Sequence, residues 1–132
     1  MKVRIWRGGQ EYVICFQHGE RDAPLEAVGP STEERGTEVT FKPSNLTFPR
    51  TEFEFVILER RLRELAFLNS GLEIILRDQR TDEKREETFY YEGGLEAFVQ
   101  WLDRARTPIV TPPITGSLEN AESGIKVEFA LS

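Results

Sequence analysis

The stretch that most constrains the fold is 58–80, LERRLRELAFLNSGLEIILRDQR, because a helical pattern changes there into a strand pattern. Apolar residues recur at helical spacing and predict one buried stripe: Phe55, Leu58, Leu62 and Leu65. The run Asn69-Ser70-Gly71 predicts the end of the helix, since glycine readily adopts the left-handed conformation that a helix C-terminus needs. Residues 72–77 then alternate between the two faces of a strand.

The start of this helix has a recognisable signal. Thr51 and Glu54 have the spacing of a capping box, in which each side chain accepts from a backbone amide of the first turn. The pattern therefore predicts a helix over 54–68. Three arginines on the rest of the cylinder are interpreted as a solvated, charged face: Arg60, Arg61 and Arg63.

The residues before the helix predict an antiparallel sheet. Residues 3–16 have the pattern of a β-hairpin, with Gly8-Gly9 supplying the positive φ angles of a tight turn. A short edge strand is predicted at 25–28 and a further strand at 37–41. After the helix, residues 72–77 and 88–91 are expected to pair across a charged turn.

The last third of the chain predicts a helix and a strand. Apolar residues from Leu95 onward keep helical spacing after Gly93-Gly94, and Pro108 ends that helix. Residues 107–116 are interpreted as an extended linker, and 118–123 as a polar loop. Residues 125–131 alternate like a strand with one buried face, whose pairing partner the pattern leaves open. Together the patterns predict an α/β fold, a two-layer, mainly antiparallel sheet with helix 54–68 packed across it.

The composition excludes some classes of function. The formal charge of −6 and pI of about 4.9 disfavour nonspecific binding to nucleic acid, which depends on lysine and arginine. The single cysteine, Cys15, cannot form an internal disulfide and fits a reducing cytoplasm. No apolar run approaches the ~20 residues that span a bilayer, so we expect a cytoplasmic protein without membrane contact.

Thr37 is the most informative polar side chain. In the strand 37–41 it shares a face with Val39 and Phe41, so its hydroxyl lies on the apolar side. A short hydroxyl on an apolar face can give directional recognition inside a dry pocket. The alternative is that Gly36-Thr37 is only a turn followed by a β-branched residue that starts a strand.

Few other residues suggest chemistry. Arg7 flanks the first hairpin turn and, on local evidence, is an exposed turn arginine. The only histidine, His18, is interpreted as a loop residue. No Cys-x-x-Cys or His-x-x-x-His spacing occurs, so no metal site is expected. No catalytic residue is assigned.

Three separated motifs occur in a familiar order: GTEVTFKP, RLRELAFLNSG and YYEGGLEAFVQWLD. With them the chain resembles, from about residue 3 to 131, the gyrase B family of bacterial DNA gyrases, which are type IIA topoisomerases with a GHKL-type ATPase domain. The resemblance implies that 1–93 is the C-terminal part of that ATPase domain. Residues 94–132 then begin, with a helix and a strand, a transducer-like domain.

The resemblance also implies site residues. Gly36, Thr37 and Val39 correspond to the adenine end of the ATP pocket in the family, where the threonine hydroxyl helps to hold the base. Arg7 corresponds to an arginine at the mouth of the pocket that contacts coumarin-type inhibitors. On this basis Gly36, Thr37 and Val39 are cofactor-binding candidates, and Arg7 is an inhibitor-contacting candidate.

Several family motifs have no counterpart in this sequence. These are the general-base glutamate, the magnesium-binding asparagine, the Asp-x-Gly-x-Gly turn and the glycine-rich lid. We therefore expect a fragment that does not hydrolyse ATP alone and binds neither ATP nor magnesium tightly, although the full-length relative uses both to drive strand passage and negative supercoiling of DNA. The implied partners are the rest of gyrase B, gyrase A, and DNA through the full complex. The alternative is a standalone interaction module that self-associates through an exposed sheet face.

Overall fold

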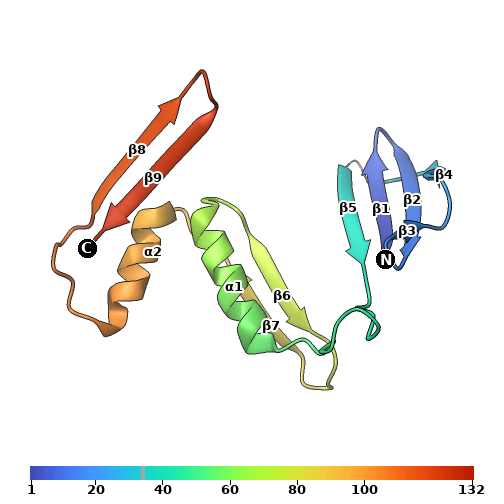
Figure 1. The fold of residues 1–132 in the computed structure, drawn as a ribbon, viewed down its shortest axis with the longest axis horizontal. Coiled ribbons are helices and arrows are strands. Elements are labelled where there is room, and N and C mark those ends of the chain that lie inside the picture. The colour runs from blue at the N-terminus through green and yellow to red at the C-terminus, as the bar shows by residue number, and fades with distance from the viewer. Residues whose placement is uncertain (34) are drawn as a thin grey trace. The chain divides into compact units, whose positions relative to one another are not determined.

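A computed structural model describes residues 1–33 and 35–132. The chain forms two units, Met1–Glu52 and Phe53–Ser132, called here the N-terminal and C-terminal units (Figure 1). The N-terminal unit contains five strands: β1 (Lys2–Arg7), β2 (Gln10–Gln17), β3 (Glu20–Arg21), β4 (Glu26–Pro30) and β5 (Arg35–Thr40). The C-terminal unit contains the remaining elements: α1 (Phe55–Leu68), β6 (Ile74–Asp78), β7 (Arg85–Phe89), α2 (Gly94–Leu102), the 3₁₀ turn η1 (Asp103–Ala105), β8 (Ile114–Asn120) and β9 (Ile125–Leu131).

The five N-terminal strands form one antiparallel sheet in the order β3-β2-β1-β5, with β4 also paired to β2. The predicted first hairpin is confirmed, since β1 pairs with β2 from Lys2 opposite Cys15 to Arg7 opposite Gln10. Its turn has φ angles of 61° at Gly8 and 72° at Gly9. Two successive positive φ angles are what a tight two-residue hairpin requires, and glycine adopts them without steric cost.

One face of this sheet carries a charged ladder across three strands. The Arg4 guanidinium donates from Nε to Glu11 at 2.9 Å on β2, and from Nη1 to Glu38 at 3.4 Å on β5. It also lies 5.1 Å from the ring centroid of Trp6. The hydrogen bond from Arg4 lowers the pKa of the Glu11 carboxyl below its ordinary value. Cross-strand pairs of opposite charge such as these stabilise a solvent-exposed face of a sheet.

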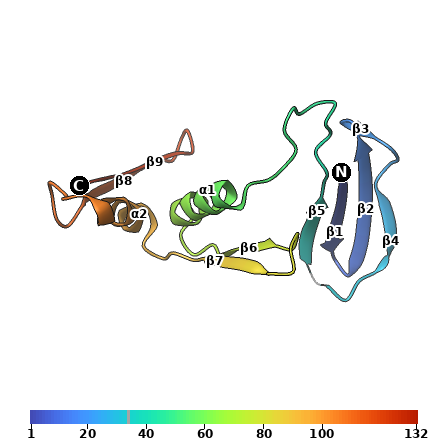
Figure 2. The ribbon, with the colours of Figure 1, turned by 90° about the horizontal axis from the view of Figure 1, so that it is seen from below.

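The switch from helix to strand in the C-terminal unit is confirmed. The Asn69 amide donates to the Leu65 carbonyl at 3.0 Å, and Gly71 has a φ of 81°. β6 and β7 then pair from Ile74 opposite Phe89 to Asp78 opposite Arg85. Helix α1 lies on one face of this hairpin (Figure 2).

The apolar core of the C-terminal unit differs in part from the predicted stripe. Four side chains are buried: Phe55, Ala66, Phe67 and Phe89. The prediction for Leu65 is wrong, since this side chain is 48% exposed. Steps of 3.6 residues from Phe55 reach position 66 after three turns, so Ala66 and its neighbour Phe67 face the hairpin instead.

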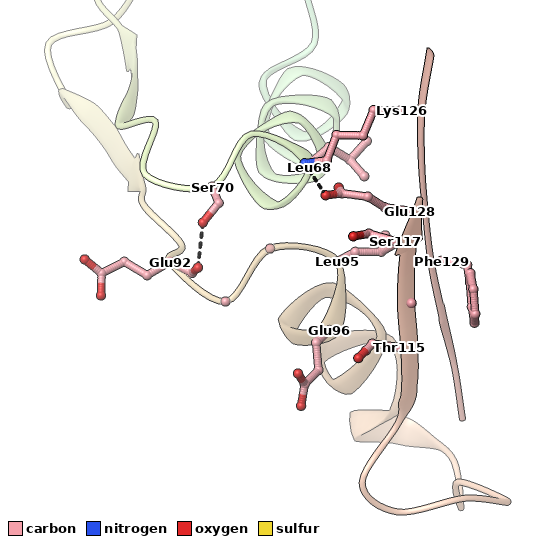
Figure 3. A pocket seen from close by; sticks show the side chains of 13 residues that line it. Leu68, Ser70, Glu92, Leu95, Glu96, Thr115, Ser117, Lys126, Glu128 and Phe129 are labelled. Carbon is pink, nitrogen blue, oxygen red and sulfur yellow. Dashed lines mark hydrogen bonds and ion pairs between the residues drawn. The ribbon is translucent and has the colours of Figure 1, made fainter. Parts of the chain in front are cut away.

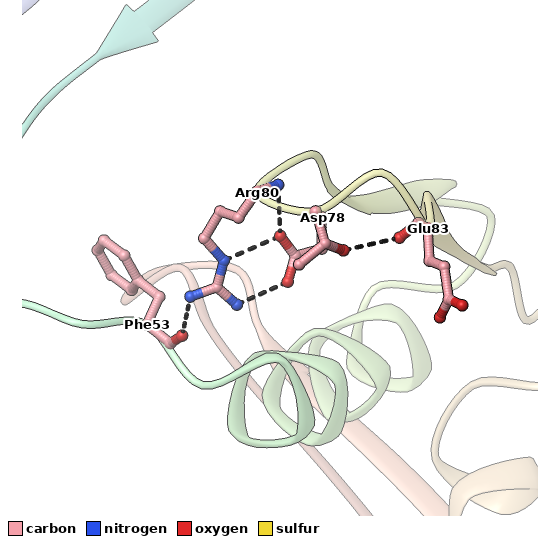
Figure 4. Close-up of polar contacts among 5 residues, drawn as sticks. Phe53, Asp78, Arg80 and Glu83 are labelled. Atoms are coloured by element: carbon pink, nitrogen blue, oxygen red, sulfur yellow. Dashed lines mark hydrogen bonds and ion pairs between the residues drawn. The ribbon is translucent and has the colours of Figure 1, made fainter.

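The predicted capping box is also wrong. Helix α1 begins at Phe55, and the residue before it, Glu54, has extended backbone angles and makes no side-chain cap. A residue from the β6–β7 turn fixes the entry to the helix instead (Figure 4). Arg80 donates from Nη1 to the Phe53 carbonyl at 2.6 Å, and from Nε and Nη2 to the Asp78 carboxylate at 2.9 and 2.6 Å.

These contacts predict an unusual titration of Asp78. Side-chain and backbone hydrogen bonds from Arg80 lower its pKa from 3.8 to about 2. Because the folded pKa is depressed, this carboxylate stabilises the fold above about pH 4 and loses that contribution as the pH falls toward 2. We expect carboxyl-carbon NMR to give a pKa of about 2, moving toward 3.8 in Arg80→Gln. Arg77→Gln, which removes the ion pair with Glu86, is the control and leaves the Asp78 titration unchanged.

The C-terminal strand, β9, pairs with a segment that the sequence patterns predict to have no regular structure. Residues 114–120, interpreted from the sequence as linker and loop, form β8 and pair with all of β9. Their glycine, Gly116, lies beneath the ring of Phe129, which fills the space that a side chain would take. The prediction that strand 125–131 has one buried face is wrong. The side chains of that face are 48% to 61% exposed: Ile125, Val127, Phe129 and Leu131.

The mixed α/β class and the antiparallel pairing are therefore confirmed. In the part of the chain that the structure describes, the strands form three separate sheets, one of five strands and two of two strands. Helix α1 contacts β6, β7 and α2. Within residues 1–33 and 35–132, no helix is both long and apolar enough to cross a membrane.

Candidate functional site

The strand register places three of the four predicted site residues on one face of the N-terminal sheet. Thr37 lies opposite Ile5, and Val39 lies opposite Val3. Arg7, two residues beyond Ile5, lies opposite Arg35. Residues directly opposite each other share a face and alternate residues of a strand return to it, so Arg7, Thr37 and Val39 are on the same side.

Thr37 stands in a row of larger side chains. Ile5 lies between Thr37 on β5 and Tyr12 on β2, and the next row contains Val39, Val3 and Ile14. We call the surface formed by these six residues the apolar face. Thr37 is exposed and Val39 is 54% exposed. The hydroxyl of Thr37 is thus an accessible polar group on an otherwise apolar surface with one aromatic ring.

Gly36, the fourth predicted residue, has a different position. It lies opposite Trp6 on the other side of the sheet, and a side chain there would begin 3.2 Å from the indole. A β-carbon that close requires the ring to move. The glycine therefore lets the indole lie close to β5. Gly36 is next to Thr37 in sequence, but it is on the opposite side of the sheet from the apolar face.

Arg35 is a neighbour that the sequence patterns did not identify. It faces Arg7 across β1 and β5, so two guanidinium groups lie at one end of the apolar face. Both side chains are exposed. The signal needed to find this pair is the pairing of β1 with β5, which joins segments 28 or more residues apart and leaves no local trace in the sequence.

The apolar face fits one end of a nucleotide better than it fits a metal ion. An aromatic base can cover the Ile5, Tyr12 and Val39 side chains, with the Thr37 hydroxyl to orient it. Magnesium prefers carboxylates, phosphates and water, and the apolar face has no carboxylate. Among the described residues, no three histidine, cysteine, aspartate or glutamate side chains form a metal-binding group.

A concave feature lies within the C-terminal unit. A cavity of about 760 Å³ opens between the end of α1, the start of α2 and the β8–β9 hairpin. Figure 3 shows Thr115, Ser117 and Glu128 of the hairpin on the side toward α2, with Phe129 on the other side. The hairpin thus presents its polar face to the cavity.

The charges of this cavity disfavour a phosphate ligand. Three carboxylates line it, from Glu92, Glu96 and Glu128, against the single ammonium of Lys126. Lys126 lies 2.6 Å from Glu128, and this hydrogen bond raises the pKa of the lysine. The cavity is therefore negative and its one cation is already paired. Sequence patterns missed it because one strand of its hairpin wall, β8, was interpreted as linker and loop.

Comparisons with known sequences show similarity to the B subunit of DNA gyrase. No family model matches the chain. The chain is 50% identical over 131 residues to the B subunit of DNA gyrase from Rickettsia conorii, which covers 99% of this chain and 16% of the relative. It is 41% identical over 141 residues to the corresponding gyrase B of Caulobacter vibrioides, again with 99% of this chain and 17% of the relative covered. The chain thus spans about one sixth of the length of these relatives.

A solved structure has the same fold. The 43K ATPase domain of Thermus thermophilus gyrase B, crystallised in complex with an aminocoumarin, matches with a TM-score of 0.78 and 31% sequence identity. The match covers 96% of this chain and 34% of that domain. Both units are therefore included in the similarity.

Proposed function

Because the chain is homologous to a segment of DNA gyrase B, within its ATPase region, we propose that the apolar face forms one wall of a nucleotide site. Thr37 and Val39 contact the adenine, and the Gly36 backbone lets β5 approach Trp6. The observation that carries the proposal is the placement of Arg7, Thr37 and Val39 on one face of the sheet. The negative cavity of the C-terminal unit is a poor alternative for a triphosphate.

The wider role follows the same homology. We assign 1–93 to the C-terminal part of the GHKL-type ATPase domain and 94–132 to the start of the transducer. In the complete protein, ATP with magnesium drives strand passage and negative supercoiling of DNA in the cytoplasm, together with gyrase A. These residues alone do not hydrolyse ATP, because the apolar face offers neither a general base nor a magnesium ligand.

Arg7 is proposed to lie at the mouth of the same site. Its side chain is exposed and shares the face of Thr37. The matching Thermus thermophilus domain was solved with an aminocoumarin bound. This supports a role for Arg7 in contacting inhibitors of that class.

Calorimetry with a non-hydrolysable ATP analogue tests the nucleotide site. We expect no measurable binding to this chain alone, and binding once a purified upstream ATPase segment of a gyrase B relative is added. In that mixture, Thr37→Val is expected to weaken binding about tenfold, the effect of one lost hydrogen bond. Thr37→Ser keeps the hydroxyl and stays close to the parent.

Thr40 provides the matched control. It is also a β5 threonine, but it lies opposite Lys2 on the charged side of the sheet. Thr40→Val therefore leaves nucleotide affinity unchanged. Equal affinities for Thr37→Val and Thr40→Val would contradict the assignment of the site to the apolar face.

A second function is favoured by a different observation. The β8–β9 hairpin exposes a continuous apolar surface, on which Leu118 is 75% and Val127 is 56% exposed. Exposed apolar patches often mark contacts with other proteins. The alternative proposal is a module that self-associates through such a sheet face, and this role is compatible with nucleotide binding elsewhere on the chain.

A further inference from the structure

The connection between β7 and α2 turns at two glycines. Gly94 has a φ of 54°, and a side chain on Gly93 would begin 2.7 Å from the β-carbon of Ala97. Glycine is the residue least restricted in backbone angle. The two glycines allow the turn, but by themselves they do not fix the direction in which α2 leaves it.

Aromatic rings near the turn supply this direction. Phe67, on the last turn of α1, is 2% exposed and stacks on Tyr91 with ring centroids 3.6 Å apart. The same ring lies 5.2 Å from Phe98 and 5.9 Å from Trp101, both on α2. One buried side chain of α1 thus contacts the residues on both sides of the glycine turn.

Arg63, one turn earlier on α1, adds a cation to this cluster. Its guanidinium lies 5.3 Å from the ring centroid of Phe89 on β7 and 5.6 Å from that of Trp101 on α2. Its Nη2 donates to Glu59 at 2.6 Å, which holds the group in place. The side chain is 24% exposed, compared with 72% for Arg60 and 69% for Arg61. The interpretation of Arg63 as part of a solvated face is therefore wrong.

Two hydrogen bonds tie the chain just before the glycines to the end of α1. The Ser70 hydroxyl donates to the Glu92 carbonyl at 2.5 Å (Figure 3). The Gly71 amide donates to the Tyr91 carbonyl at 3.1 Å. Both bonds hold the segment that carries Tyr91, so the turn is fixed by hydrogen bonds to its backbone as well as by the rings.

On its other side, α2 contacts the β8–β9 hairpin through β9. The open cavity of about 760 Å³ separates much of its polar face from α1 and α2. Residues 107–113, which lead into β8, contain three prolines. Helix α2 is therefore held against α1 by aromatic and cation–π contacts. On the side of the hairpin, the cavity interrupts its packing.

We infer that Arg63 and the Phe67–Tyr91–Phe98–Trp101 rings form a clamp that makes α2 one cooperative unit with α1. Arg63 is a positioning residue in this clamp, because it contacts β7 and α2 together. The boundary of this unit then lies after α2, at 107–113, and Gly93-Gly94 is a fixed corner. Helix α2 thus moves with α1, although the assignment proposed above places it at the start of the transducer. This inference stands on the geometry of the C-terminal unit and does not depend on the nucleotide site.

Amide hydrogen exchange on the full 132-residue chain tests the clamp. In the parent protein we expect the slowest amides of α1 and of residues 98–102 to have protection factors within about threefold of each other, as for one cooperative unit. In Arg63→Met, the protection of 98–102 falls roughly tenfold relative to that of α1. Arg61→Met, on the exposed side of the same helix, leaves the ratio unchanged.

Two results would overturn the inference. If 98–102 exchange more than about tenfold faster than α1 in the parent, the helices are already separate, whatever the variants do. If Arg63→Met lowers the protection of both helices equally, Arg63 stabilises the unit without coupling its helices. The parent measurement decides the question even if the variant fails to fold.

Discussion

Replacing Phe67 by alanine is expected to remove about 3–5 kcal/mol from the free energy of unfolding of the C-terminal unit. The ring is 2% exposed and stacks on Tyr91 at 3.6 Å. Its loss leaves a cavity at the point where α1, Tyr91 and α2 meet. Since domains of this size have only about 5–15 kcal/mol of stability, the variant is expected to be partly unfolded at room temperature.

Urea unfolding followed by the fluorescence of Trp101 measures this loss. The chain has two tryptophans, Trp6 and Trp101, so the experiment is done with Trp6→Phe in every variant. Leu68→Ala is the matched control, because Leu68 is adjacent to Phe67 but 56% exposed. We expect it to cost less than about 1 kcal/mol. Similar losses for the two variants would contradict the placement of Phe67 at the centre of this core.

Local conformational signals explain what could be predicted from the sequence. The turn at Gly8-Gly9 and the helix end at Gly71 both need positive φ angles. Glycine makes such positions visible in a single sequence, and the hairpin register follows from the length of the turn. The alternation of Thr37 and Val39 is local in the same way, so their shared face was predictable.

The missed features depend on contacts between distant residues. β8 contains Gly116, which marks a loop by propensity but lies in a strand because the Phe129 ring covers it. Arg63 has the polarity of a surface residue, yet its guanidinium lies over two aromatic rings. Tertiary contacts override local preference at both positions, and no pattern within either segment reveals it.

The candidate site combines both kinds of information. The common face of Thr37 and Val39 follows from strand alternation, whereas the addition of Arg7 and Tyr12 to that face requires the pairing of β1 with its two neighbours. The chemistry assigned to the face came from the resemblance of three motifs to gyrase B. The nucleotide role of these residues stays a prediction until binding is measured.

Self-association is expected to depend on the exposed face of the β8–β9 hairpin. Leu118 lies directly opposite Val127 on that face. Leu118→Lys combined with Val127→Glu replaces an apolar pair with a cross-strand ion pair, which keeps the hairpin compatible with its register. Each buried apolar side chain contributes about 1.5–3 kcal/mol. The double variant is therefore expected to weaken self-association at least about a hundredfold, as measured by analytical ultracentrifugation.

The opposite face of the hairpin supplies the control. Ser117 lies opposite Glu128 on the polar side, so Ser117→Lys adds charge without touching the apolar surface and leaves association unchanged. A parent chain that stays monomeric at about 100 μM would contradict the self-association proposal, because a specific apolar interface is expected to hold two copies together at that concentration. If instead the parent associates and only Val39→Lys disrupts it, the contact lies on the N-terminal sheet. Nucleotide and a second copy of the chain would then compete for the same apolar face.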